Sequence, residues 1–478
     1  MLFRSNTEIW VAPLRKQPVK EEDVRQLSAE GGDTFAFTPD STAVIYSVGN
    51  LVWRQRLAGG ELEEIPIRFE IQHPMPPPLL LRRARMLDFK TRGFGRETCL
   101  FIEEGRIRWM GSERGRQLPR TTVVVDAGGR FAIPGLFDMH VHVDVDQANQ
   151  QLFLAYGVTS VRDTGGWLAG LTALADRGYA TGEPVPRIFF SGEIFEGAQP
   201  AYNDSYMLIH DEDEARGYAR RWKDWGAQFI KVYYSLPWPL QRAVADEARR
   251  QGLPVVGHGT NVEEITRSVT LGYTTLEHSS LTNRLYDDVL QMLARTGTRW
   301  DPTLALMGGD ALLLRDEPER LADAKLRAFS AEWEIRYALA GVGFKDIGDV
   351  ELRGRWVVQL AGVRAAHHSG VKLQAGTDAP PFSGSSLHWE LEHFFEAGLA
   401  PLVVLRIATQ EAAAAVGAQD DLGTLDPGKL ADIVLLDKNP LEDIKNTQTI
   451  WRVIKSGWLF DPDKLRPPAA VNSSGEKQ

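Results

Sequence analysis

The sequence predicts an α/β protein built around a (β/α)8 TIM barrel, with a small β-domain made from both ends of the chain and a short β-rich segment in front. Three observations lead to this fold. Eight short apolar runs, each ending in polar residues, follow one another in the middle of the chain, and helical patterns separate them. Several of these helical patterns end on glycine, as helix C-caps do. Eight such units within about 280 residues match the size of a barrel of this kind.

The eight predicted strands can be read directly from the sequence. They are FAIPGLFDMHVHVD (131–144), YGVTSVRD (156–163), PRIFFSGE (186–193), FIKVYYS (229–235), LPVVGHGT (253–260), YTTLEHSS (273–280), TRWDPTLAL (298–306) and KLQAGTDAP (372–380). In such a barrel the carboxyl ends of the strands lie on one face and carry the catalytic groups. We therefore predict a barrel over residues 135–416 whose strand-end polar residues lie together.

Residues 1–72 form a separate β-rich segment. The stretch 34–67 reads as four short strands broken by turns at Pro39-Asp40, Gly49-Asn50 and Gly59-Gly60. With its FTPD turn, IYS strand and VWRQRLAGGE strand and turn, it resembles one blade of a TolB-type β-propeller; a plain β-rich extension is the alternative. Because a propeller needs several blades, either the chain is a truncated product of a longer gene or this remnant packs on the next domain.

Short strand patterns flank the barrel on both sides, in residues 79–134 and again in residues 417–465. We expect the two sets to form one small β-domain, which requires the two ends of the intervening barrel to meet. The proline-rich residues 73–78 are predicted to be a stiff linker. Residues 466–478 are small and polar and are predicted to be a disordered tail.

Composition excludes several classes of function. Lys and Arg number 54 against 64 Asp and Glu, a formal net charge of -10, and no basic cluster is interleaved with aromatic residues, so nucleic acid is not an expected partner. The sequence has no apolar run of about 18 residues and no signal-peptide pattern, which predicts neither a membrane span nor secretion. We expect a cytoplasmic protein, or an extracytoplasmic one if the chain is an N-terminal truncation. The single Cys99 excludes a cysteine-rich metal cluster.

Two histidines stand at the end of the first predicted strand. His140 and His142 are two residues apart in an extended setting, so both imidazoles point to the same side of the strand. Such a pair is half of a site for a cation such as zinc, provided that other strands supply further ligands. Two ordinary histidines are the alternative. The other candidate ligands on the predicted strands are Lys231, His258, His278 and Asp378.

Lys231 lies in the middle of the fourth predicted strand. Alternation places Phe229, Lys231 and Tyr233 on one face of that strand. If this face points into the barrel, an unpaired ammonium there would cost several kcal/mol. The lysine must then be paired, neutralised or chemically altered.

Six separated motifs resemble the amidohydrolase superfamily, in the branch near imidazolonepropionase-like and prolidase-like enzymes. They are PGLFDMHVH, IKVYYS, GHG, LEHSS, GTDAP and the terminal LGTLDPGKLADIVLLDKNPL. The resemblance implies a distorted barrel carrying a composite β-sandwich, and a binuclear centre of divalent metals such as zinc. His140, His142 and Asp378 would hold one metal, and His258 and His278 the other. Lys231, carboxylated by carbon dioxide, would bridge both as a carbamate. One departure is ATQEA (408–412), where the family usually has T-x-N-P-A.

The resemblance also implies a mechanism. A metal-bridging hydroxide would attack a carbon-nitrogen bond of a small amide, dipeptide, N-acyl amino acid or cyclic amide. Asp378 would transfer the proton, and Tyr233 would bind the oxyanion or a substrate carboxylate, with a barrel-wall aromatic as the alternative. His388, beyond the eighth strand, would reach the substrate. A deaminase or a silent scaffold is the alternative function; Lys231 argues against the first and the intact ligand set against the second. A homo-oligomer is left open.

Overall fold

The computed structural model describes residues 2–5, 8–13, 20–28, 32, 34–48, 51–67, 74–143, 147–180, 182–201, 205–278, 285–330, 334–336 and 347–465. Its elements divide into two compact units. The first unit comprises Met1–Gln72, Gly165–Ala173 and Phe190–Pro254, and the second comprises His73–Thr164, Leu174–Phe189 and Val255–Gln478. The tail predicted over 466–478 lies outside the described residues.

The described residues of the first unit form three sets of strands, one 3-10 helix and two α-helices, together with the first part of the helix Leu168–Ala180. Its elements are β1 (Leu2–Ser5), β2 (Glu8–Val11), η1 (Glu21–Asp23), β3 (Arg25–Gln26), β4 (Phe35–Phe37), β5 (Ala43–Val48), β6 (Leu51–Arg56), β7 (Glu63–Glu64), β17 (Ile194–Glu196), β18 (Tyr206–Leu208), α3 (Glu212–Asp224), β19 (Ile230–Val232) and α4 (Trp238–Gln251). Strands β4 to β7 form one antiparallel sheet, as four strands were predicted there, and β18, β17 and β19 are neighbours in that order. Ile9, Val44 and Tyr46 share an apolar cluster against which Trp225 packs. The N-terminal segment thus packs on residues that follow α3.

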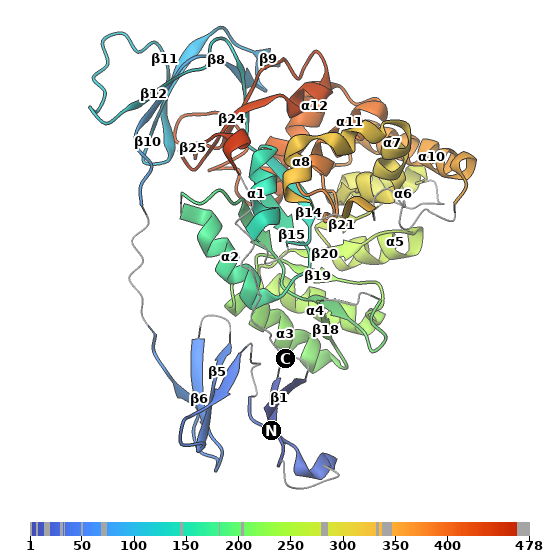
Figure 1. The fold of residues 1–478 in the computed structure, drawn as a ribbon. Coiled ribbons are helices and arrows are strands. Elements are labelled where there is room, and N and C mark those ends of the chain that lie inside the picture. The colour runs from blue at the N-terminus through green and yellow to red at the C-terminus, as the bar shows by residue number, and fades with distance from the viewer. Residues whose placement is uncertain are drawn as a thin grey trace. The chain divides into compact units, whose positions relative to one another are not determined.

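In the second unit, segments from far apart in the chain form one sheet of nine strands. Its strands are β8 (Leu79–Asp88), β9 (Gly93–Phe94), β10 (Thr98–Glu103), β11 (Arg106–Gly111), β12 (Val123–Asp126), β13 (Phe131–Pro134), β23 (Ile433–Leu436), β24 (Ile450–Lys455) and β25 (Trp458–Phe460). Strand β13 pairs with β8 on one side and with β23 on the other. Figure 1 shows the pale blue strands β8 and β10 near the red strands β24 and β25. Leu81, Leu100, Ile433 and Ile454 are fully buried in its core.

A second group of strands in this unit runs parallel. It consists of β14 (Leu136–Val141), β15 (Val158–Asp163), β16 (Arg187–Phe190), β20 (Val255–His258), β21 (Thr275–Glu277) and β22 (Arg299–Asp301). Strands β14, β15 and β16 are neighbours in that order, and so are β20, β21 and β22. With β19 of the first unit, seven of the eight predicted strands are present.

The eighth predicted strand is not a regular strand, which corrects the sequence prediction. Residues 372–379 make single bridges, Leu373 to Trp300 of β22 and Ala379 to Val141 of β14. Asp378 has a φ of 63°, which lies outside the extended region, so the backbone leaves the strand conformation at this residue. A side-chain carbon at Gly376 would come within 2.4 Å of Asp301, so the close packing there requires a glycine. The segment nevertheless joins β22 to β14, so β20, β21, β22, this segment, β14, β15 and β16 follow one another as a curled sheet.

Helices connect and flank these strands. They are α1 (Gln147–Ala155), α2 (Leu168–Ala180), α5 (Val262–Leu271), α6 (Asp287–Thr296), η2 (Ala305–Gly309), α7 (Asp310–Asp316), η3 (Pro318–Ala322), α8 (Ala324–Phe329), α10 (Asp349–His368), α11 (Ser385–Glu396), α12 (Pro401–Arg406), η4 (Ile407–Glu411), α13 (Ala412–Ala415), η5 (Ile444–Gln448) and η6 (Pro462–Lys464). Among the described residues, none of the helices has the length and apolar character needed to cross a membrane.

Strand β24 ends in a buried lysine that makes stability depend on pH. Burial and the neighbouring Arg187 lower the pKa of Lys455 to about 7, and its Nζ donates to the carbonyl of Gly178. At pH values between this pKa and the ordinary pKa of a lysine in the unfolded chain, Lys455 is protonated in the unfolded state and neutral in the folded state. The free energy of unfolding therefore rises with pH over this range. We expect the free energy of unfolding of the wild type to gain up to about 1.4 kcal/mol per pH unit relative to Lys455→Met from about pH 7 to pH 9.

Urea unfolding at a series of pH values measures this difference. The exposed Lys464 offers a control, Lys464→Met, whose difference from the wild type should stay constant with pH. A constant difference for Lys455→Met as well would contradict the prediction.

Candidate metal centre

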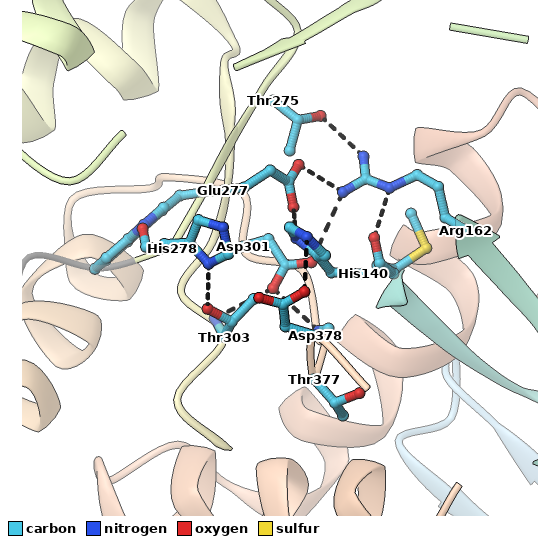
Figure 2. A network of polar contacts seen from close by, with 12 residues as sticks. His140, Arg162, Thr275, Glu277, His278, Asp301, Thr303, Thr377 and Asp378 are labelled. Atoms are coloured by element: carbon cyan, nitrogen blue, oxygen red, sulfur yellow. Dashed lines mark hydrogen bonds and ion pairs between the residues drawn. The ribbon is translucent and has the colours of Figure 1, made fainter. Parts of the chain in front are cut away.

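Four histidines and one aspartate converge at the carboxyl ends of the parallel strands in the second unit. Strand β14 carries His140 and is followed by His142, β20 ends at His258, and His278 directly follows β21. Asp378 comes from the segment that joins β22 to β14. Because parallel strands end on the same side of a sheet, side chains that are distant in the sequence meet here, as the strand order predicts. Figure 2 shows His140, His278 and Asp378 facing one another.

Three of these side chains are close enough to hold one metal ion together. His142 Nε2 lies 3.0 Å from Asp378 Oδ1, and His140 Nε2 lies 3.4 Å from the same oxygen. One ligand atom each of His140, His142 and Asp378 falls within 4.8 Å of the other two. The ring of His278 has its centroid 4.8 Å from that of His140 and 4.4 Å from that of His258. The structure thus brings together five of the six ligands predicted from the sequence.

Two of the imidazoles are held by hydrogen bonds at Nδ1. His140 Nδ1 lies 2.7 Å from Glu277 Oε2, and His278 Nδ1 lies 2.9 Å from Thr303 Oγ1. Metal-binding histidines commonly use their second nitrogen in this way, which fixes the ring and its tautomer. With Nδ1 engaged, Nε2 is the nitrogen through which each of these rings would bind a metal ion.

A buried ion pair supports the first of these bonds. Arg162 Nη2 lies 2.6 Å from Glu277 Oε1, and Arg162 Nε donates to the carbonyl oxygen of Met139 at 2.6 Å. Both side chains are almost fully buried. Figure 2 shows this chain of contacts from Arg162 through Glu277 to His140. A guanidinium that also holds the backbone beside His140 stiffens the strand end on which two ligands stand.

Two further buried aspartates line the centre. Asp301 accepts a hydrogen bond from Gly376 N at 3.0 Å, and Asp138 accepts one from Thr377 Oγ1 at 2.8 Å. Burial, and then the charge of Glu277, raise the pKa of Asp301 well above its ordinary value; burial raises the pKa of Asp138 to about 7. The two hydrogen bonds connect the segment that contains Asp378 to β22 and β14.

Asp378 itself is held in the charged form. Burial works against its charge, but His140, His142 and His278 hold the pKa of this carboxyl well below its ordinary value. The backbone is also strained, because His278, Thr303 and Asp378 have φ values of 71°, 43° and 63°. Positive φ costs energy for residues with a side chain and is concentrated at functional sites.

The structure describes two further predicted site residues, on β19 and just beyond it. Lys231 is 1% exposed in β19, and Tyr233 is half-buried just beyond that strand, its ring centroid 4.8 Å from that of Tyr234. Both residues belong to the first unit, whereas the five clustered ligands belong to the second.

His388 does not join the cluster. It is fully buried on α11, and its ring nitrogens lie 2.9 Å from Thr447 Oγ1 and 2.9 Å from the carbonyl oxygen of Tyr156. Burial lowers its pKa to about 4. This position gives His388 a packing role and does not support the substrate contact expected from the sequence.

The sequence indicates only some of the residues around the predicted ligands. Arg162 ends the second predicted strand, where an ion pair that supports the mouth of the barrel is the expected role. Asp138 alternates with His140 and His142 in DMHVH, and Glu277 directly precedes His278. Asp301 and Thr303 carry no such signal, because their contacts depend on distant partners and on the local backbone.

Comparisons with known proteins agree with this geometry. The model of the Amidohydrolase family matches residues 131–459. Ochratoxinase of Aspergillus niger is 25% identical over 440 residues, covering 78% of this chain and 84% of the relative. Imidazolonepropionase of Polaromonas sp. is 25% identical over 382 residues, covering 72% and 83%. The crystal structure of a Xaa-Pro dipeptidase with bound methionine superposes with a TM-score of 0.63 at 21% identity, over 80% of this chain and all of the other, which shows a shared fold.

Proposed function

The chain belongs to the amidohydrolase family, and from this premise we propose that it hydrolyses a carbon-nitrogen bond of a small amide, dipeptide or cyclic amide at a binuclear metal centre. The observation that carries the proposal is the convergence of four imidazoles and the Asp378 carboxylate at the ends of parallel strands. A buried group of polar side chains that is costly to desolvate is typical of a site that binds a ligand.

The donor set fits divalent metal ions. Neutral imidazoles and a charged carboxylate are the ligands that zinc accepts. Nδ1 of His140 contacts the Glu277 carboxylate, and Nδ1 of His278 contacts the Thr303 hydroxyl. His140, His142 and Asp378 would hold one ion, and His258 and His278 the second. Bound there, the two ions supply a water of lowered pKa and polarise the carbonyl of the substrate.

We extend the proposal to the barrel and to Lys231. The curled sheet of the second unit contains six of the eight predicted strands and the irregular eighth segment. By its order in the sequence, β19 is the missing fourth strand of a TIM barrel over residues 135–416, with residues 79–134 and 417–465 forming the β-sandwich. Lys231 would then enter the centre from β19 and bridge the two ions as a carbamate, which replaces a buried ammonium by an oxygen-donor anion.

The proposed reaction assigns two further roles to side chains of this chain. The Asp378 carboxylate takes a proton from the attacking water and passes it to the leaving nitrogen, so that an amine leaves and a carboxylate forms. The Tyr233 hydroxyl donates a hydrogen bond to the oxyanion or to a substrate carboxylate. A single hydroxyl at a narrow barrel mouth suits small substrates with an anionic end.

A metal analysis combined with a substrate screen tests this function. The purified protein should contain about two equivalents of zinc or a similar metal, and should hydrolyse members of a panel of dipeptides, N-acyl amino acids and lactams. His142→Ala should reduce both metal content and hydrolysis. Activity restricted to phosphate esters or aminopurines, or a metal-free wild-type protein that is fully active, would overturn the proposal.

Glu277 offers a test of the support around the ligands. Glu277→Gln keeps the size of the side chain but removes the charge that holds Arg162 and orients His140, so we expect metal affinity to fall by about 10- to 100-fold. Competition with a chromogenic chelator measures that affinity. Glu183→Gln, which weakens a surface pair with Arg177, is the control and should bind metal like the wild type. Equal affinities for all three proteins would show that Glu277 does not orient His140.

A further inference from the structure

The orientation of His278 depends on a short turn after β22. Thr303, two residues beyond the end of β22, has a φ of 43° and places its Oγ1 2.9 Å from His278 Nδ1. The chain then enters the π-helical segment η2 (Ala305–Gly309), in which Met307 and Gly308 depart from helical geometry. A threonine does not intrinsically favour a positive φ. Contacts with other residues must therefore stabilise this turn.

A buried glutamate from a distant helix holds this turn. Glu390, on α11, is 0% exposed. Its Oε1 accepts a hydrogen bond from Leu304 N at 3.1 Å, and its Oε2 accepts one from Ala305 N at 2.6 Å. These amides begin a helical segment and would otherwise lack acceptors, as the first amides of helices do. The carboxylate therefore fixes the two residues that directly follow Thr303.

A second side chain holds the other end of the same segment. Gln359, buried on α10, donates from Nε2 to the carbonyl oxygen of Met307 at 2.8 Å. The η2 segment is therefore bound from two helices, through its first amides and through a carbonyl near its end. A segment fixed in this way can hold the Thr303 hydroxyl at one position relative to His278.

A buried acidic group is an unusual choice for this task. Burial raises the pKa of Glu390 to about 8, because its surroundings oppose the charged form. Helices usually satisfy their first amides with a local serine, threonine or aspartate at the N-cap, which needs no buried acidic side chain from elsewhere. At η2 the N-cap is Leu304 and makes no side-chain bond. An acceptor from a distant helix connects the turn to α11, whereas a local N-cap residue would only stabilise the turn internally.

We propose that Glu390 is a positioning residue of the metal centre: it fixes the turn that carries Thr303, and through the Thr303 hydroxyl it sets the ring of His278 for metal binding. The inference rests on the proposed function. It gives Glu390, on α11, a role in positioning His278, which differs from the substrate contact expected of His388 on the same helix.

Glu390→Gln tests the inference. The glutamine keeps the shape and one acceptor oxygen, but its NH2 group cannot accept the hydrogen bond from the second backbone N–H. Cobalt(II) is the probe, since its visible absorption reports the ligand geometry independently of turnover. We expect one of the two bound equivalents to weaken by about 10- to 100-fold, with an altered cobalt spectrum, and kcat to fall more than KM changes. Glu392→Gln is the matched control: it lies on the same helix and pairs with Arg320, so its cobalt binding and spectrum should match the wild type.

Thr303→Val supplies a second route if Glu390→Gln does not fold. It removes the hydroxyl while keeping the branched shape. We expect it to weaken the binding of the same one of the two cobalt equivalents by a similar factor. If both residues act through one path, the double variant should bind cobalt no more weakly than the poorer single variant. Additive losses, or a folded Glu390→Gln protein with wild-type binding and spectrum, would overturn the inference and leave the proposed function intact. A wild-type protein that binds no cobalt and hydrolyses no amide would overturn both.

Discussion

Replacing Lys231 by alanine is expected to lower the metal content from about two equivalents to one or none and to abolish turnover. The side chain is 1% exposed in β19. An ammonium buried beside two dications would be repelled by them as well as desolvated, so the state that fits the proposed centre is a carbamate that gives one oxygen to each ion. Removing the side chain removes that bridge.

Elemental analysis together with a hydrolysis assay decides this prediction. Added short-chain carboxylates should restore part of both metal content and activity to the Lys231→Ala protein, since they can supply the lost oxygens. His367→Ala is the control, because this half-buried histidine on α10 lies outside the clustered ligands and should leave both quantities unchanged. A Lys231→Ala protein with two metals and full activity would show that Lys231 is not a ligand.

Local sequence patterns were sufficient for most of the fold. The apolar runs that end in polar residues correspond to β14, β15, β16, β19, β20, β21 and β22, because short buried parallel strands leave that pattern. The eighth run failed as a strand, since close packing at Gly376 and the positive φ of Asp378 break its regularity. Neither feature is visible before the neighbouring His140 and Asp301 are in place.

The candidate site was predictable to the extent that it follows from strand order. His140, His142, His258, His278 and Asp378 each stand at a strand end or on the segment beside one, so their meeting needed only the topology. The contacts that hold these side chains in place could not be predicted from strand order. The contacts of Arg162 with Glu277 and of Glu390 with Ala305 join residues 115 and 85 positions apart, and no periodic sequence pattern indicates them.

Two substitutions of Asp378 should separate its roles as ligand and as proton carrier. Asp378→Ala removes the oxygen that lies 3.0 Å from His142 Nε2 and should lose both metal and turnover. Asp378→Asn keeps the size and one carbonyl oxygen as a neutral ligand, so we expect it to retain more metal than Asp378→Ala. Its amide cannot accept and return a proton, so kcat per bound metal should fall by about 10²- to 10⁴-fold.

The comparison must be made per bound metal, because a lower occupancy alone would lower the apparent kcat. Steady-state kinetics and elemental analysis on the same samples give that ratio, and Asp461→Asn, which weakens a pair with Arg452 away from the centre, is the control. The three histidines around Asp378 lower the pKa of its carboxyl, so the group is charged near neutral pH and could serve as an anionic ligand. An Asp378→Asn protein whose kcat per metal equals that of the wild type would mean that another group carries the proton, and Asp378 would remain a ligand only.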